Sequence, residues 1–388
     1  MAAVAVDKGF FGIPVKVSAE RLLLALNAED ENFYQLLNNN VIRASQELND
    51  ACEAIRSYIL STKVVNADET TLRVIRNGEK GNCSVGYIWG ISYNGEGPNA
   101  VYAKYFNGRT NECAASVLEG LEPGTFLQTD GYASYGSVVK DINEYFKVRA
   151  GFNKEEAEDA VFADVVDEDI VLCGCLCHSR RRYIELMKAY QSATLTSSSK
   201  VLDVCAEMIT LSNSVFTEEK TLFEQFKKGN FTEEEFLEKR KESIAPLYDK
   251  MKKICKRELR EENREALTPK LIEALTYTLN NADTMKNYIR SSELSASNNA
   301  QERHWKVVQR GRASSLFASS VRGADAWVKY FMLCRTAYIN KVDPTAYIKY
   351  LFDEIALMNR NYTVRSSVDW ERYLPWNVSK EALSKAFD

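Results

Sequence analysis

The chain has no excess of positive charge, although basic residues gather at a few places. Its 50 basic and 54 acidic residues give a net charge of -4. A dedicated DNA-binding protein usually carries a basic excess, because neutralising phosphates drives much of its affinity. Any contact with nucleic acid must therefore be local. The basic residues cluster at 180–182 and at Lys306, Arg310, Arg312 and Arg322.

Long apolar runs and disulfide-type cysteine spacing are also missing. No stretch approaches the roughly 20 apolar residues that a membrane span needs, so we expect no membrane association. The first eight residues, MAAVAVDK, lack a basic region followed by a long apolar core, and we expect no secretory signal. The nine cysteines are scattered, which favours the reducing cytoplasm as the location of the chain.

The remaining composition is ordinary for a globular protein, with 45% hydrophobic and 27% charged residues among 388. Hydrophobic periodicity predicts helices from residue 18 and over 42–60, and then strands with tight turns at 77–78, 80–81 and 94–98. The predicted strands are 64–75, 84–93, 100–106, 125–129 and 170–178. The predicted helices are 110–121, 132–145, most of 180–290, 324–340 and 344–358. This order indicates an α/β fold with a mixed sheet.

Three carboxylates stand where catalysis would need them. Asp68 lies within the first predicted strand, Asp130 follows the fourth, and Glu302 lies on a helix predicted to start at 299. Three hard oxygen donors of this kind can hold a pair of divalent metal ions, which suit phosphodiester chemistry. Lys306 and Arg310 share the helix face of Glu302, where they would meet phosphates. Gly311 is predicted to end this helix as a C-terminal cap.

Each of these residues also has a purely structural interpretation. Asp68 can be an ordinary acidic residue at a strand end or turn. Asp130-Gly131 is a turn dipeptide, and Asn299 with Glu302 forms a capping-box pattern. Taken singly, the structural interpretation is favoured for each of them.

A cysteine-rich stretch raises the possibility of zinc. Cys173, Cys175 and Cys177 precede His178, and the chain has only one other histidine, His304. Alternate residues of a strand point the same way, whereas structural zinc sites use Cys-x2–4-Cys pairs from turns, so buried structural cysteines are favoured. Whether His178 is structural or lies near phosphate or metal is left open.

Several short segments resemble one protein family, in the right order from residue 64 to the end. They are ADET at 67–70, TDGY at 129–132, HSRRRY at 178–183, NNAQER at 298–303, GR at 311–312, LFA at 316–318 and LPWN at 374–377. Together they are similar to the transposases of the insertion sequence 66 family.

This resemblance implies a ribonuclease H-like core of the three-acid (DDE) type, an α/β fold interrupted by a large all-helical insertion before the last catalytic helix. It implies that Asp68, Asp130 and Glu302 are catalytic and bind two Mg²⁺ or Mn²⁺ ions. The implied DNA-binding residues are His178, Arg181, Arg182, Lys306, Arg310 and Arg312. The implied partners are transposon-end and target DNA and further copies of the chain, as a homodimer or higher oligomer.

The predicted organisation has five parts. These are an N-terminal helical region (1–63), the first core part (64–179), the helical insertion (180–296), the second core part (297–345) and a C-terminal helix and tail (346–388). Residues 1–63 show neither the DNA-recognition region nor the zinc module usual in the family, and acidic 153–169 resembles an extra insertion. Two other functions remain open: a truncated or domesticated derivative that binds DNA without transposing, and a structure-selective nuclease.

Overall fold

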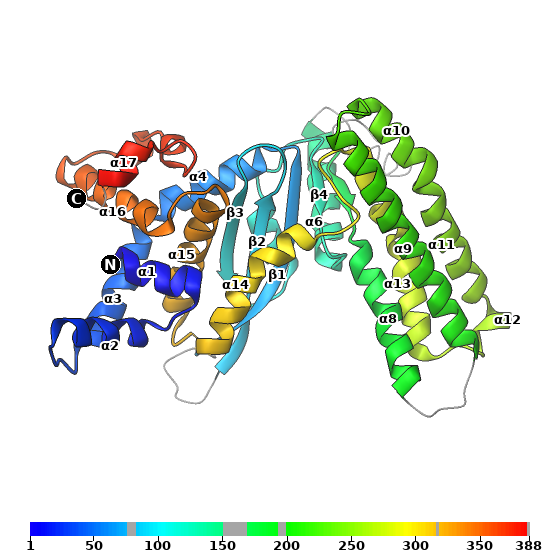
Figure 1. Ribbon diagram of the computed structural model, residues 1–388, viewed down its shortest axis with the longest axis horizontal. Coiled ribbons are helices and arrows are strands. Elements are labelled where there is room, and N and C mark those ends of the chain that lie inside the picture. Colours follow the sequence, from blue (N-terminus) through cyan, green and yellow to red (C-terminus); the bar gives the residue numbers. More distant parts are fainter. Residues whose placement is uncertain (76–82, 150–168, 193–198, 316–317, 386–388) are drawn as a thin grey trace. The chain divides into compact units, whose positions relative to one another are not determined.

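The computed structural model describes residues 1–75, 83–149, 169–192, 199–315 and 318–385 (Figure 1). The predicted turns at 77–78 and 80–81, most of the acidic segment 153–169, and residues 316–317 of the LFA motif lie outside these residues. The chain divides into two compact units. Unit 1 comprises Met1–Glu122 and Ala300–Asp388, and unit 2 comprises Pro123–Asn299.

Unit 1 is built on three antiparallel strands, β1 (Val64–Ile75), β2 (Cys83–Tyr93) and β3 (Ala100–Phe106). Their order is β3-β2-β1, with Asp68 opposite Gly90 and Gly90 opposite Ala103. The strand predictions are confirmed to within one residue, because alternating β-branched and aromatic residues bounded by turn residues are typical of such hairpins.

Helices cover this sheet. The N-terminal helices are α1 (Ala2–Val6), α2 (Val15–Leu26), α3 (Phe33–Gln46) and α4 (Asn49–Leu60), with a π-helix at Asp7–Phe11, and α5 (Asn111–Leu118) follows β3. The later helices are α14 (Asn299–Ser315), α15 (Val321–Ile339), α16 (Pro344–Arg360) and α17 (Lys380–Ser384), with 3₁₀ turns at Arg365–Ser367 and Trp370–Tyr373. The predicted helix 42–60 is wrong in one respect, because α3 and α4 are separate and break at 47–48.

The outer strand β3 forms an edge of the sheet of unit 1, and helices cover it. Helices α15 and α4 pack against it, and the Val101 amide donates to Thr336 Oγ1 on α15 at 3.1 Å. An edge strand exposes backbone donors that pair readily with other chains, so a covering helix prevents that pairing. Helix α14 lies over β1 and β2, as Figure 1 shows.

Unit 2 combines a short parallel strand pair with a group of long helices. Strand β4 (Phe126–Gln128) pairs with β5 (Val171–Cys173), and α6 (Ala133–Arg149) lies between them in sequence. The helices that follow are α8 (Leu176–Ser192), α9 (Ser199–Lys227), α10 (Glu233–Ser243), α11 (Ala245–Glu258), α12 (Glu261–Arg264) and α13 (Pro269–Lys286), with a 3₁₀ turn at Asn287–Arg290. The chain therefore has the mixed α/β composition that the sequence predicts. None of the helices in the described ranges is long and apolar enough to cross a bilayer.

A buried arginine holds the helices of unit 2 to the segment that returns from them. Arg240 on α10 is fully buried, pairs with Glu219 on α9, and donates to the carbonyl oxygens of Ser291 and Leu294 at 2.7 and 2.8 Å. Because a buried guanidinium is costly without partners, these bonds tie the return segment to α9 and α10.

Candidate active site

Asp68 lies in the middle of β1 and its carboxylate is held from two sides. The Glu69 amide donates to Oδ1 at 2.8 Å, and the indole Nε1 of Trp305 donates to Oδ2 at 3.0 Å. Trp305 lies on α14, so this bond joins two elements that are 237 residues apart in the chain. A carboxylate has about four lone-pair positions, so accepting these two bonds is compatible with binding a cation.

Helix α14 is seated closely on the sheet of unit 1. The Trp305 side chain is 2% exposed and its ring lies against Gly90, where a Cβ atom would be 2.5 Å from Trp305 Cη2. Further along the helix, Arg312 Nη1 donates to the carbonyl and the hydroxyl oxygen of Thr71, both at 2.7 Å. Residues three apart on a helix share a face. Glu302, one turn before Trp305, therefore lies on the side of α14 that faces β1.

A polar network around His304 fixes the start of α14. His304 Nδ1 accepts a bond from Arg335 Nε at 3.1 Å, and its Nε2 therefore carries the proton and donates to Asn94 Oδ1 at 3.0 Å. Burial, followed by the charges of Arg335 and Arg303, lowers the pKa of His304 to about 3. Both ring nitrogens of His304 are therefore bonded to side chains of the same unit, and its imidazole is part of the packing of α14. It ties α14 to α15 and to the end of β2.

Asp130 occupies the end of β4 in unit 2. Its Oδ1 accepts the Tyr132 amide at 2.9 Å, and Gly131 between them has φ +87°, a left-handed conformation that favours glycine. The Tyr277 hydroxyl on α13 donates to the Asp130 carbonyl oxygen at 2.7 Å. Burial, aided by the Asp130 charge, raises the pKa of Tyr277 to about 12. The turn predicted at Asp130-Gly131 is thus present, and it fixes the carboxylate.

His178 lies at the same edge of the parallel strand pair, but not on a strand. The strand predicted over 170–178 is present at its start but is too long, because β5 ends at Cys173 and α8 begins at Leu176. Gly174 turns the chain there: its amide donates to the Thr284 carbonyl oxygen at 2.9 Å, and a Cβ on Gly174 would lie 2.9 Å from Met285 Cγ. Since β4 and β5 are parallel, Asp130 and His178 follow the carboxyl ends of neighbouring strands.

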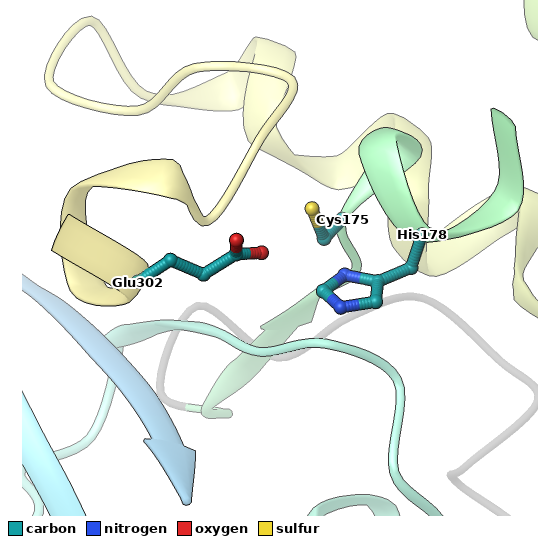
Figure 2. Close-up of side chains that lie close together, drawn as sticks. All are labelled: Cys175, His178 and Glu302. Atoms are coloured by element: carbon teal, nitrogen blue, oxygen red, sulfur yellow. The ribbon is translucent and has the colours of Figure 1, made fainter. Parts of the chain in front are cut away.

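The three cysteines do not share one strand face as predicted. Cys173 is the last residue of β5, Cys175 lies in the connection, and Cys177 is in α8. Figure 2 shows the Cys175 thiol in this connection and the His178 imidazole at the start of α8. A hydrogen bond with Cys177, followed by burial, holds the pKa of Cys175 well above its usual range.

The basic residues singled out in the sequence have different surroundings. Lys306 and Arg310 are exposed on α14, and Arg181 is exposed on α8. Arg182 donates to Glu273 Oε1 at 2.9 Å and lies 4.1 Å from the centre of the Tyr277 ring, and Arg312 is bonded to Thr71. The exposed Lys306, Arg310 and Arg181 are suited to contact phosphates. The side chains of Arg182 and Arg312 also connect elements of the fold.

The two units divide the predicted site residues between them. Unit 1 contains Asp68, Glu302, Lys306, Arg310 and Arg312, and unit 2 contains Asp130, His178, Arg181 and Arg182. Within unit 1 the structure brings the helix of Glu302 onto the strand of Asp68, and within unit 2 it brings Asp130 and His178 to one sheet edge.

Two residues of the site were missed in the sequence. Trp305 was not among the predicted site residues, yet it donates a hydrogen bond to Asp68. Its position one turn after Glu302, on the same helix face, could have indicated a place in the site. Tyr277 carries no such signal, because its bond to the Asp130 carbonyl depends on how α13 packs.

Comparison with known proteins agrees with the resemblance seen in the short motifs. The chain is 24% identical over 342 residues to the uncharacterized protein y4qI of Sinorhizobium fredii (strain NBRC 101917 / NGR234), covering 87% of this chain and 55% of that protein. The uncharacterized protein y4hP of the same strain is 22% identical over 327 residues, with 82% and 53% covered. The chain thus spans about half the length of the curated relatives it matches.

No solved structure matches this chain significantly. The family model described as "Transposase IS66 family" matches residues 27–326, which is most of the chain and includes Asp68, Asp130 and Glu302. The chain therefore belongs to the IS66 family of transposases.

Proposed function

We propose that this chain is a DDE transposase that cleaves DNA at transposon ends and transfers the freed strand into target DNA. Family membership supports a transposase in general. The observation that carries the finer assignment is the Trp305–Asp68 hydrogen bond, which seats the helix of Glu302 on the strand of Asp68. Asp130, held in its own turn at the end of β4, is the third acid of the proposed set.

The proposed fold is a ribonuclease H-like core. Three antiparallel strands, a helix and two parallel strands joined through a helix occur in chain order in β1, β2, β3, α5, β4, α6 and β5. Helices α8 to α13 then precede α14, as expected for a helical insertion before the helix that carries the last acid.

The residues present fit a divalent metal with a preference for oxygen. Asp68 and Asp130 each accept bonds from neutral N–H donors, which orient a carboxylate without neutralising its charge. We propose that these two carboxylates and Glu302 hold two Mg²⁺ or Mn²⁺ ions. The ions would lower the pKa of the attacking water or hydroxyl and stabilise the charge that develops on the phosphate.

The chain's own side chains would bind and align the DNA. Lys306 and Arg310, exposed on the helix of Glu302, would contact phosphates on either side of the reacting one. Arg181 and His178 would contact phosphates from α8. Arg182 in unit 2 and Arg312 in unit 1 would add positive charge near the acids of their own unit. In the proposed reaction, water adds to phosphorus and the 3′-oxygen leaves as a hydroxyl. That hydroxyl then attacks the phosphorus of a target phosphodiester, where a new P–O bond forms as the target strand's own 3′-oxygen leaves as a hydroxyl.

Joining two transposon ends to one target requires that both ends are held together. We therefore propose an assembly of at least two copies of the chain on DNA.

Terminal inverted repeats found in the genomic flanks of the gene are the substrate for the test of this proposal. The purified protein should nick duplexes that carry these repeats in the presence of Mg²⁺. Asp130→Asn should lower the rate about a thousand-fold, because metal binding supplies several kcal/mol of transition-state stabilisation. Asp141→Asn changes an exposed acid of α6 in the same unit and should leave the rate unchanged.

Two outcomes would overturn the assignment. One is full activity of Asp130→Asn. The other is a wild-type protein that binds the repeats but does not cleave them with either Mg²⁺ or Mn²⁺, the behaviour of a derivative that only binds DNA.

A further inference from the structure

A groove on the helices of unit 2 is lined by positive charge. It has a volume of about 760 Å³ and lies between α9 and α11, far in sequence from the three acids. Five basic residues line it: Lys250, Lys253, Lys256, Arg257 and Arg260. All five side chains are exposed, in a chain whose overall charge is negative.

The helix period places these charges in a stripe. Lys250, Lys253 and Arg257 follow one another on α11 at intervals of three and four residues, which keeps them on one face, and Arg260 follows just after the helix ends at Glu258. The opposite face of α11 carries the fully buried Met251 and Cys255. The stripe is therefore a consequence of the same amphipathic pattern that docks α11 onto its neighbours.

The carboxylates near this stripe pair with its arginines and leave the charge of its lysines: Arg257 Nε lies 2.6 Å from Glu258 Oε1, and Arg260 Nη1 lies 3.8 Å from Glu262 Oε1. Among the described residues that line the groove, Glu207 alone carries a carboxylate, and it pairs with Arg257 at 3.1 Å. Asp249, also on α11, is paired with Lys286 on α13. In the described part of the chain, Lys250, Lys253 and Lys256 have no carboxylate within 4.0 Å.

We propose that this groove binds the sugar–phosphate backbone of duplex DNA, outside the catalytic site and without regard to base sequence. The proposal rests on the proposed function, which brings DNA to the protein. Lys250 and Arg257 are separated by about 10 Å along the helix axis, roughly three base-pair steps of a duplex. A stripe of this length matches a linear polyanion better than a single small anion.

The lining of the groove favours a duplex over a single strand. Its apolar part consists of the aliphatic side chains of Leu211 and Ile254, and none of the described residues that line it is aromatic. Proteins that bind single strands stack bases on aromatic rings, and this groove offers none. Phosphate contacts of this kind fix the position of a protein on DNA and do not read its sequence.

The test measures how DNA affinity depends on salt. Binding of fluorescent 40-base-pair duplexes of two unrelated sequences is followed by anisotropy over a NaCl series, in EDTA so that cleavage does not occur. Combined Lys250→Gln, Lys253→Gln and Lys256→Gln should weaken binding equally for both sequences. The slope of log K against log salt should become shallower by about 0.9 for each phosphate that the variant no longer neutralises, up to about 3.

A matched control carries the same change in charge. Lys220, Lys228 and Lys241 are exposed lysines of unit 2 outside the groove, two of them paired with Glu224 and Glu238. Their triple change to glutamine should leave the slope unaltered. A triple change of the groove lysines to arginine keeps the charge and should retain wild-type binding, which separates loss of charge from loss of fold.

The proposal is overturned by equal slopes in the groove and control variants, or by a loss confined to one DNA sequence. It is also overturned if the groove variant loses affinity for single-stranded DNA or duplex RNA but not for duplex DNA. Its failure is distinguishable from failure of the proposed function, because the binding assay needs no cleavage. If the wild-type protein cuts DNA but the groove variant has an unchanged salt slope, only the proposal that the groove binds DNA is refuted.

Discussion

At the scale of single residues, the carboxylate of Asp68 is oriented by a tryptophan. The indole N–H of Trp305 donates to Oδ2, while its ring lies against Gly90 and stacks near Phe331 with ring centres 5.9 Å apart. Partners that orient a metal-binding carboxylate commonly alter metal affinity when they are removed. Trp305 is thus both a packing residue and a positioning residue of the proposed site.

Trp305→Phe separates these two roles. Phenylalanine keeps an aromatic ring but cannot donate to Asp68, so we expect metal affinity to fall about 10- to 100-fold. The free energy of unfolding should fall by about 1–3 kcal/mol, from the lost hydrogen bond and from the space that the smaller ring leaves. Isothermal titration with Mn²⁺ and chemical denaturation provide the two measurements.

Trp327→Phe is the control, since Trp327 is a buried tryptophan of the same unit that makes no bond to Asp68. Equal losses of metal affinity in the two variants would show that Trp305 acts through packing alone.

At the scale of elements, α14 continues past the glycine that was predicted to end it. The helix runs to Ser315, and Gly311 lies inside it, against Gly12, which has φ +71°. Trp327 on α15 packs against the same position. The prediction was wrong because glycine serves two purposes: it permits left-handed caps, and it permits close approach of other elements. At position 311, the close approach of Gly12 and Trp327 is what requires a glycine.

Gly311→Ala should destabilise the protein. A Cβ atom at this position would lie 2.4 Å from Trp327 Cζ2, so we expect the free energy of unfolding to fall by about 1–3 kcal/mol. Gly136 lies within α6, where the nearest atom to an added Cβ is 3.9 Å away. Gly136→Ala should therefore raise stability by about 0.5–1 kcal/mol. Urea denaturation followed by circular dichroism compares the two, and a stabilising Gly311→Ala would disprove the packing argument.

At the scale of the whole molecule, the proposed catalytic acids come from both compact units. Asp68 and Glu302 belong to unit 1 and Asp130 belongs to unit 2. An ion that binds only the native state stabilises it by mass action, by about 2.7 kcal/mol when its concentration is a hundred times Kd.

Mg²⁺ or Mn²⁺ should accordingly raise the thermal midpoint of the wild-type protein by several degrees, in a concentration-dependent way. Asp68→Asn and Asp130→Asn should each reduce this shift, whereas Asp141→Asn should not. Differential scanning calorimetry measures the effect. If Asp130→Asn retains the full shift while Asp68→Asn loses it, the ions bind within unit 1 and the three-acid proposal is wrong.

Much of the local structure was predictable because it depends on neighbouring residues. The bounds of β1 and β3 agree with the predicted strands, and α16 begins at Pro344 as predicted. The short motifs around Asp68, Asp130 and Glu302 likewise indicated the family that the comparison confirms. The division into five parts and the roles of the individual acids remain predictions.

What only the tertiary structure decided are the contacts between residues far apart in the chain. The bond from Trp305 to Asp68, the packing of Gly311 on Gly12, and the end of β5 at Gly174 all depend on an element brought in from elsewhere. Periodicity and capping patterns report interactions over three or four residues. They contain no information on which distant helix will fill a given position, and that choice depends on how the whole core packs.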